Sequence, residues 1–122
     1  MTKEQKLFKN LIKADLHICK KYYDSPDKAL RLMAAYHMQQ AVEKTIKLKA
    51  EINGLNLWGH DIVKLMAKCD EAGIDIGIPK YIRIKAVDIT RWEVECRYYP
   101  VRVARKDTLK KLYDITVDWL DT

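Results

Sequence analysis

The sequence predicts an all-α protein, arranged as an up-and-down four-helix bundle with an additional C-terminal helix. Apolar residues recur at spacings of three and four through most of the chain, which is the period of an amphipathic helix. Only four glycines and three prolines interrupt the 122 residues, so the connections between helices are short. A chain of this length fits one domain, residues 1–122, with a core that needs neither disulfides nor metal.

The first predicted helix covers residues 3–24 and stops at Asp24-Ser25-Pro26. Helical spacing places five of its apolar residues on a common face: Leu7, Leu11, Ala14, Ile18 and Tyr22. His17 lies at the edge of this face, where a structural histidine is more frequent than a ligand-binding one. We therefore leave His17 out of the candidate site.

The central predicted helix covers residues 27–54, and the rest of the chain is organised around it. Its apolar stripe consists of Leu30, Ala34, Met38, Ala41, Thr45, Leu48 and Ile52. Ser25 is the candidate N-cap, Pro26 suits the first helical position, and Asn53-Gly54 ends the helix. Because Ala35, Val42 and Ile46 widen the apolar arc, we expect this helix to be buried among several neighbours.

A polar ladder of His37, Gln40 and Lys44 stands on one flank of that stripe, on successive helical turns. Such a ladder taken alone is typical of the solvated rim of an amphipathic helix.

The segment 54–59 is long enough to reverse the chain into an antiparallel helix, and Trp58 is expected to plug the end of the bundle. The next helix opens at His60-Asp61, where an acidic charge favours a helix N-terminus, and ends near Ala72-Gly73. Its apolar repeat consists of Ile62, Leu65, Met66 and Cys69.

Residues 74–79 are predicted to form a loop whose isoleucines cover the core. A fourth helix runs from Lys80 to a stop before Pro100, and a last helix starts at Asp107-Thr108. The repeat of the fourth helix consists of Ile82, Ala86, Ile89, Glu93 and Cys96, with Trp92 and Val94 alongside. The last helix carries Leu109, Leu112, Ile115, Thr116, Trp119 and Leu120.

The net charge of +6 and the pI near 9.2 favour an anionic partner such as a nucleotide, a nucleic acid or an acidic protein. Lysines and arginines are spread along the chain, however, so solvated helix faces account for most of them. No apolar run is long enough to span a bilayer and no signal-type segment opens the chain, so we expect a cytoplasmic protein without a membrane partner.

The three cysteines Cys19, Cys69 and Cys96 lie far apart, each within an apolar helical pattern, and are expected to be buried small hydrophobes. The chain has no closely paired cysteines or histidines at metal-ligand spacing. We predict neither a metal nor a cofactor.

Three short motifs together resemble the signatures of the HEPN domain family, in the same order and at similar intervals. The matching stretches are Ala35-Tyr36-His37-Met38-Gln39-Gln40-Ala41-Val42-Glu43-Lys44, Gly59-His60-Asp61-Ile62 with Leu65, and Cys96-Arg97-Tyr98-Tyr99-Pro100. They correspond to H-x-x-Q-x-x-E-K, H-D-L and R-Y-P. Ile62 in place of leucine and an extra tyrosine before Pro100 are minor departures.

The resemblance implies a small helical bundle with an added short helix, usually dimeric, that binds nucleotides or RNA. The same fold forms the C-terminal part of aminoglycoside nucleotidyltransferases. Small free-standing members are often encoded beside a minimal nucleotidyltransferase, so the resemblance also implies such a partner.

Some members of the family are ribonuclease toxins with an R-x(4-6)-H motif in a later helix. The only formal match here is Arg31 to His37 in the central helix, and six helical steps turn the two side chains about 120° apart. His60 is the last histidine, so no arginine of the later helices is followed by one. The family's ribonuclease chemistry therefore lacks its general base, and we predict no catalytic residues.

The candidate ligand-binding residues gathered around one cleft are His37, Gln40, Lys44, His60, Asp61, Arg97 and Tyr98. Lysine and arginine can neutralise phosphate, glutamine can contact a base or ribose edge, and tyrosine can stack on a base. Histidine can donate a hydrogen bond. The alternative is a purely structural role, in which Asp61 pairs with Arg97 or Lys44 in a partly buried network that ties helices together.

Two hypotheses about partners follow. The chain has no strand turn followed by the metal-binding acids of a nucleotidyltransferase, so those acids would come from a separate protein. The last third of the chain is rich in aromatic and apolar residues with arginines among them, which predicts a homodimer. Those residues are Tyr81, Trp92, Val94, Tyr98, Tyr99, Val101, Val103, Tyr113 and Trp119, with Arg91, Arg97 and Arg102.

Overall fold

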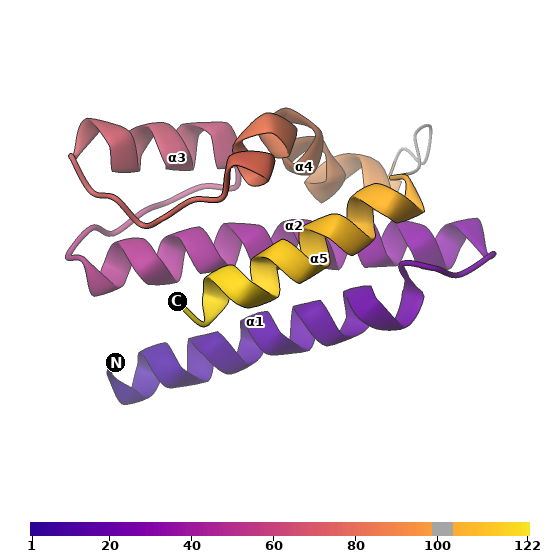
Figure 1. The fold of residues 1–122 in the computed structure, drawn as a ribbon, viewed down its shortest axis with the longest axis horizontal. Helices are drawn as coiled ribbons and strands as arrows, with labels where there is room; N and C mark the ends of the chain where they lie inside the picture. Colours follow the sequence, from indigo (N-terminus) through magenta and orange to yellow (C-terminus); the bar gives the residue numbers. More distant parts are fainter. Residues whose placement is uncertain (99–103) are drawn as a thin grey trace.

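The computed structural model describes residues 1–98 and 104–122, and these fold into five α-helices with no strand among them (Figure 1). The helices are α1 (Lys3–Tyr22), α2 (Lys28–Ile52), α3 (Ile62–Glu71), α4 (Lys80–Tyr98) and α5 (Lys106–Leu120). Helix α2 packs against each of the other four. The predicted all-α fold and the central position of residues 27–54 are thereby confirmed.

Helix α2 is buried on several sides at once, as its wide apolar arc predicted. Ala34, Met38, Ala41, Val42 and Ile46 are inaccessible to solvent. The start of the helix differs from the prediction, because the N-cap is Asp27, whose side chain accepts a hydrogen bond from the Ala29 N–H at 2.8 Å. The predicted cap, Ser25, instead accepts a hydrogen bond from the Asp27 N–H through its hydroxyl.

Helix α1 buries a different face from the one predicted. The buried residues are Ile12, Asp15, Leu16 and Cys19, while Leu7, Leu11 and Ala14 are exposed. Both faces carry apolar residues at helical spacing, so periodicity could not decide between them. The predicted structural role of His17 is also wrong, because its side chain is exposed.

The connection after α2 does not reverse the chain into an antiparallel helix. It runs back beside α2, so that α3 points in the same direction as α2 (Figure 1). His60 contacts Glu43, which lies nine residues before the end of α2, and this shows how far back the connection reaches. Trp58 does not plug the bundle end either, because it is 80% exposed.

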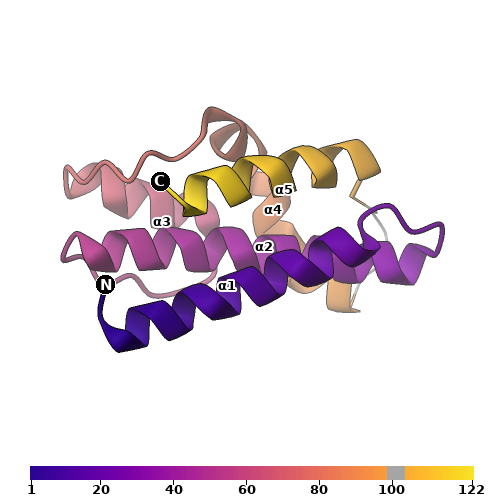
Figure 2. The ribbon, with the colours of Figure 1, turned by 60° about the horizontal axis from the view of Figure 1, so that its bottom comes forward.

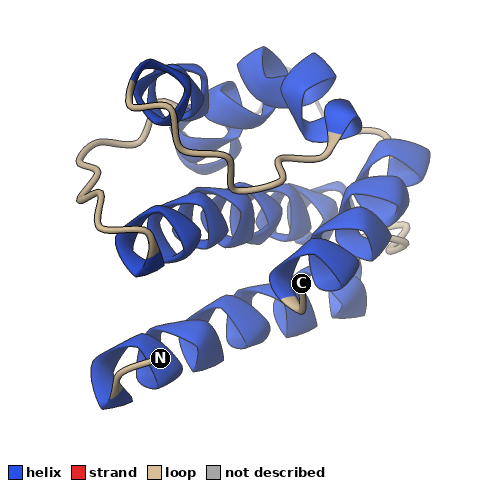
Figure 3. Ribbon diagram, turned by 60° about the vertical axis from the view of Figure 1, so that its left-hand side comes forward, coloured by secondary structure: helices blue, strands red, loops and turns tan. Residues whose placement is uncertain are grey.

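Helices α3, α4 and α5 follow their predicted patterns closely. Ile62, Leu65, Met66 and Cys69 are buried in α3, and α5 begins within two residues of its predicted start. The predicted loop 74–79 is confirmed, and the Trp119 indole N–H donates to the Ile76 carbonyl at 2.9 Å. Helix α5 packs against α1 and α2 (Figure 2), and Figure 3 shows it on the opposite side of the molecule from α3.

Two of the tryptophans expected to exceed the capacity of a single bundle are in fact part of its core. Trp92 and Trp119 are 7% and 4% exposed, so this part of the argument for a dimer is wrong. Val94 and Tyr98 are exposed on α4. The predictions on residues 99–103, including the end of the R-Y-P motif, lie outside the described residues.

All three cysteines are free and buried, as predicted. Burial raises the pKa of the Cys19 and Cys96 thiols to about 12, so both are protonated and inert near neutral pH. None of the described helices is both long and apolar enough to cross a membrane.

Candidate functional site

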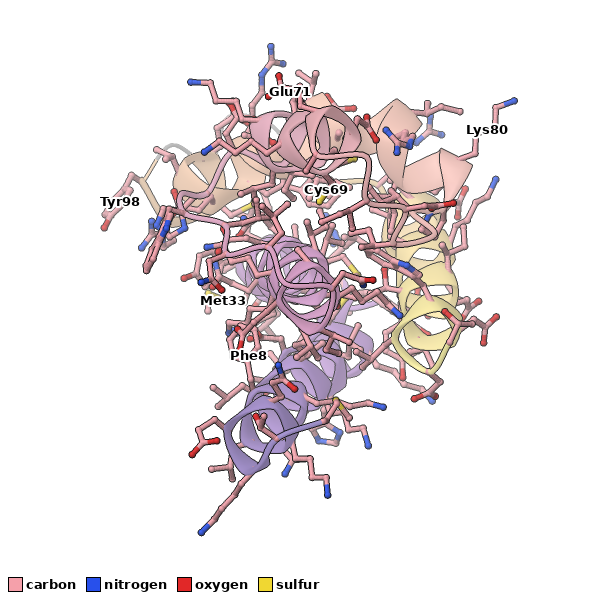
Figure 4. All side chains as sticks on the ribbon, turned by 90° about the vertical axis from the view of Figure 1, so that its left-hand side faces the viewer. Phe8, Met33, Cys69, Glu71, Lys80 and Tyr98 are labelled. Carbon is pink, nitrogen blue, oxygen red and sulfur yellow. The ribbon has the colours of Figure 1, made fainter. Side chains whose placement is uncertain are left out.

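One face of α2 carries polar side chains along most of its length. We call this face the α2 strip. It consists of His37, Gln40, Lys44, Lys47 and Glu51, which recur at spacings of three and four, and Met33 precedes them on the same face. In a view along α2, Phe8, Met33 and Tyr98 lie on one side of this helix, and α5 lies on the opposite side (Figure 4). The strip therefore runs along the face of the central helix that α5 leaves open.

A buried carboxylate from α1 holds two of the predicted site residues. Asp15 Oδ1 lies 2.8 Å from His37 Nδ1, and Asp15 Oδ2 accepts from Lys44 Nζ at 2.6 Å. His37 and Lys44 stand seven residues apart, two turns along α2, so a single aspartate joins both ends of the ladder. This contact also ties α1 to α2 through charge-assisted hydrogen bonds.

A second carboxylate, Glu43, contacts three polar side chains on the other flank of the strip. It accepts from Gln39 Nε2 at 2.9 Å and from Lys47 Nζ at 3.1 Å, and it lies 3.0 Å from His60 Nδ1. Gln40 joins this network by donating to Gln39 Oε1 at 2.6 Å. His60 is thereby held at the entrance to α3.

The predicted pair from α4, Arg97 and Tyr98, reaches the strip through an aromatic ring. The Arg97 guanidinium lies 5.1 Å from the ring centroids of both Tyr36 and Tyr98, which is a cation–π distance. The Tyr36 ring packs edge to face against the His37 ring, with centroids 5.3 Å apart. Arg97 also donates to the Glu93 carboxylate at 2.7 Å.

Asp61 is separate from the rest of the predicted site. Its carboxylate caps α3 by accepting from the Lys64 N–H at 3.2 Å. The pairing of Asp61 with Arg97 or Lys44, which the structural alternative required, is not formed, because these cations bind Glu93 and Asp15. A structural network does exist, but it is built on Asp15 and Glu43.

The carboxylates lie deep and their cationic partners lie nearer the surface. The side chains of Asp15 and Glu43 are 9% and 5% exposed, whereas Lys44 and Lys47 are 23% and 21% exposed. A buried anion fixes the direction of the lysine that binds it. The buried carboxylates therefore hold Lys44 and Lys47 in fixed positions, and the exposed parts of these two lysines form part of the surface of the strip.

Sequence reasoning missed several members of this site. They are Asp15, Tyr36, Gln39, Glu43 and Lys47. Tyr36, Gln39 and Glu43 stood within the quoted motif but were assigned no role. Asp15 had a detectable signal, because it is an acidic residue at helical spacing between the apolar Ile12 and Cys19.

No group of three or more His, Cys, Asp or Glu side chains in residues 1–98 and 104–122 is placed to hold a metal ion.

Comparison with known proteins decides the family. The family model of the HEPN domain matches residues 10–117, which is most of the chain. The chain belongs to the HEPN domain family. No curated protein matches it significantly. Among solved structures, this HEPN domain is similar to TT1696 from Thermus thermophilus, with a TM-score of 0.72 and 20% sequence identity. The match covers 98% of this chain and 95% of TT1696, and at this identity it supports the fold alone.

The formal R-x(4-6)-H match of this HEPN domain does not form a joint site within the chain. Arg31 donates to the Ser25 carbonyl at 2.7 Å, whereas His37 faces Asp15 on α1. The two side chains thus engage different partners, in keeping with the turn of about 120° between them.

Proposed function

We propose that this HEPN domain protein is a non-catalytic binding module for a nucleotide or RNA, with the α2 strip and Arg97 as its contact surface. One observation carries the proposal: buried carboxylates hold cations at the surface of α2, beside an arginine that lies against two tyrosine rings. Cations next to exposed aromatic rings are the chemistry that binds phosphate and base together.

Each residue has a role in this proposal. Lys44 and Arg97 contact phosphate, and Gln40 contacts a base or ribose edge. Tyr98, which is 64% exposed, offers its ring for stacking on a base. His37 donates a hydrogen bond from a position fixed by Asp15.

The competing function is a structural one, in which the same residues serve only to tie helices together. The contacts of Asp15 and Glu43 support that role as well. The two functions differ at Arg97 and Tyr98, because an exposed tyrosine beside a cation adds little to the packing of the bundle.

The decisive experiment changes Arg97 and measures ligand binding. We expect Arg97→Glu to weaken the binding of ATP, GTP or a labelled RNA at least tenfold, because it replaces a phosphate-binding cation with an anion. Lys6→Glu is the matched control, since Lys6 is exposed in the first turn of α1, where an acidic residue is well tolerated. Calorimetry gives the nucleotide affinities and fluorescence anisotropy the RNA affinity.

Circular dichroism shows whether both variants stay folded. Equal affinities of Arg97→Glu and the original protein would contradict the proposed surface. Absence of binding by the original protein would contradict the function itself.

A ribonuclease toxin is the less well supported alternative. Arg31 binds the Ser25 carbonyl in the connection before α2, whereas His37 binds Asp15 on α1, so the two side chains are not paired at the only formal motif. The binding role needs no such pair.

We propose further that the protein acts with a separately encoded minimal nucleotidyltransferase. Among the described residues, no cluster of acidic side chains could hold the metal ions that nucleotidyl transfer requires. The HEPN domain would then supply one wall of a site whose carboxylates come from the partner. A neighbouring gene without a nucleotidyltransferase signature would count against this pairing.

The last part of the proposal is that the protein forms a homodimer through α4. Apart from the face that lines the core, α4 has an outer face with spacings of three and four, which is the pattern of a helix-pairing seam. This outer face consists of Ile84, Val87, Arg91, Val94 and Tyr98, all of them exposed. Asp88 and Glu95 flank Arg91, so in an antiparallel pair each arginine meets acidic residues of the second copy.

A further inference from the structure

Trp58 stands out because nothing in the proposed function uses it. It is 80% exposed, and it lies on the connection between α2 and α3, next to Gly59, which has a φ of 101°. A residue other than glycine rarely adopts this φ, so Gly59 sets the turn that follows Trp58. A large aromatic ring kept in solvent offers its face to a ligand.

A groove of about 340 Å³ lies at the foot of Trp58, between α1, α2 and the connection. Its lining combines apolar and aromatic side chains with hydrogen-bonding ones. The lining residues are Phe8, Lys47, Glu51, Asn56, Leu57 and Trp58. Flat apolar faces suit the plane of a heteroaromatic ring, while a carboxylate, an amide and an ammonium group suit its polar edge. This lining matches the chemistry of a nucleobase.

The groove is continuous with the α2 strip. Lys47 and Glu51 belong to both, and Glu43 binds Lys47 on one side and His60, two residues after Trp58, on the other. The strip therefore has cations in its middle and aromatic rings at both ends, namely Tyr36 and Tyr98 beside Arg97, and Phe8 and Trp58 in the groove.

The length of the strip sets the size of the ligand. His37 and Glu51 are fourteen residues apart on α2, which corresponds to about 21 Å at 1.5 Å per residue. That length accommodates about six stacked nucleotides at 3.4 Å each, and fewer in an extended strand. A mononucleotide would reach one end of the strip only.

We propose that the groove of Phe8 and Trp58 is a second subsite, which binds a base of a single-stranded RNA whose backbone follows the α2 strip to Arg97. This inference rests on the proposed function and specifies its ligand. Trp58 stacks on the base, Lys47 and Lys44 contact the backbone, and the Arg97 end binds the other part of the strand.

The test compares a short RNA with a mononucleotide. The probes are a fluorescein-labelled hexanucleotide of adenosine, measured by anisotropy, and AMP, measured by calorimetry. We expect Trp58→Ala to weaken hexanucleotide binding by about five- to 150-fold, the usual loss for one base stacked on an aromatic ring, and to leave AMP binding unchanged. Trp58→Phe retains a stacking face and should stay within about twofold of the original protein.

Leu7→Ala is the matched control, because Leu7 is a large apolar side chain exposed on α1. It should leave both affinities unchanged. Hexanucleotide affinity that is insensitive to Trp58→Ala would overturn the second subsite and indicate another role for Trp58, such as contact with a protein. An equal loss of AMP and hexanucleotide binding would overturn it too.

The two proposals fail in different ways. If Arg97→Glu weakens binding but Trp58→Ala does not, the binding function stands and the second subsite falls. If the original protein binds neither probe, both the binding function and the second subsite are contradicted.

Discussion

Asp15 is an acidic residue on the buried face of α1, and it organises the polar side of the central helix. Its two oxygens receive His37 and Lys44 from α2, so both ladder residues have fixed directions. The cost of burying the carboxylate is offset by these charge-assisted contacts. A single residue of one helix thus positions two candidate ligand-binding residues of another.

Replacing Asp15 with asparagine should therefore be costly. The change leaves Lys44 without its counter-charge in a partly buried site, and we expect a loss of about 2–3 kcal/mol in the free energy of unfolding. Urea denaturation followed by circular dichroism measures this loss.

Asp121→Asn is the control for that experiment, because the Asp121 side chain is 65% exposed and forms an ion pair with Lys9 at 3.5 Å. Exposed pairs contribute about 0–1 kcal/mol. If Asp15→Asn destabilised the protein no more than Asp121→Asn, the organising role of Asp15 would be wrong.

At the scale of single residues, the polar ladder could be predicted from the sequence, but Asp15, which binds two of its members, could not. His37, Gln40 and Lys44 share a face because helical geometry requires it. The predicted apolar face of α1 was wrong, since Leu7 and Leu11 fit the same period as the buried Ile12 and Leu16. Only the packing of α1 against α2 decides which of the two faces is buried. The burial of Asp15 therefore could not be predicted either.

Among the helices, α5 differs from α1, α2 and α3 at its N-terminus. Thr2, Asp27 and Asp61 each accept a backbone hydrogen bond as side-chain caps, whereas Arg105, the N-cap of α5, makes no such bond. The backbone of Arg105 already has the extended conformation of a cap, with φ −69° and ψ 142°. The position is therefore ready for a capping side chain.

We expect Arg105→Asp to raise the free energy of unfolding by about 1 kcal/mol. The new carboxylate would accept from a free N–H of the first turn and would favour the positive end of the helix dipole. Thermal unfolding followed by circular dichroism measures the gain. Arg105→Ala removes the same cation without supplying a cap, so an equal gain in both variants would contradict the capping explanation.

The ends of α3 and α4 could be predicted within about two residues because glycine, proline and a capping aspartate mark them locally, and the start of α5 could be predicted from its polar residues. The path of the chain between α2 and α3 could not. Its length allowed a simple reversal, but the connection runs back along α2, where His60 contacts Glu43. That contact joins residues 17 positions apart and has no local signal.

At the scale of the whole molecule, the outer face of α4 is a row of exposed residues, four of them apolar or aromatic, on the side of this helix that faces away from the bundle. It lies opposite the buried residues of α4, so it adds nothing to the core of its own chain. Exposed apolar residues in a continuous row are typical of an interface. Tyr98 belongs to this row and to the candidate site, so pairing would bring two sites close together.

We expect the protein to sediment as a dimer at micromolar concentration, and Val87→Glu to shift it to the monomer. The charge would be buried against the apolar side chains of the second copy, at a cost of several kcal/mol. Val63→Glu is the control, since Val63 is exposed on α3 and does not belong to the row. A monomeric mass for the original protein would contradict the pairing.

Trp58 also gives the molecule an optical property. Trp92 and Trp119 are shielded within the bundle, so their fluorescence emission should lie at shorter wavelength and resist quenching by acrylamide. Trp58 is in water, and its emission should lie at longer wavelength and be quenched readily. The long-wavelength part of the spectrum therefore comes mainly from a single indole at one end of the α2 strip, and it reports on that place in the unlabelled protein.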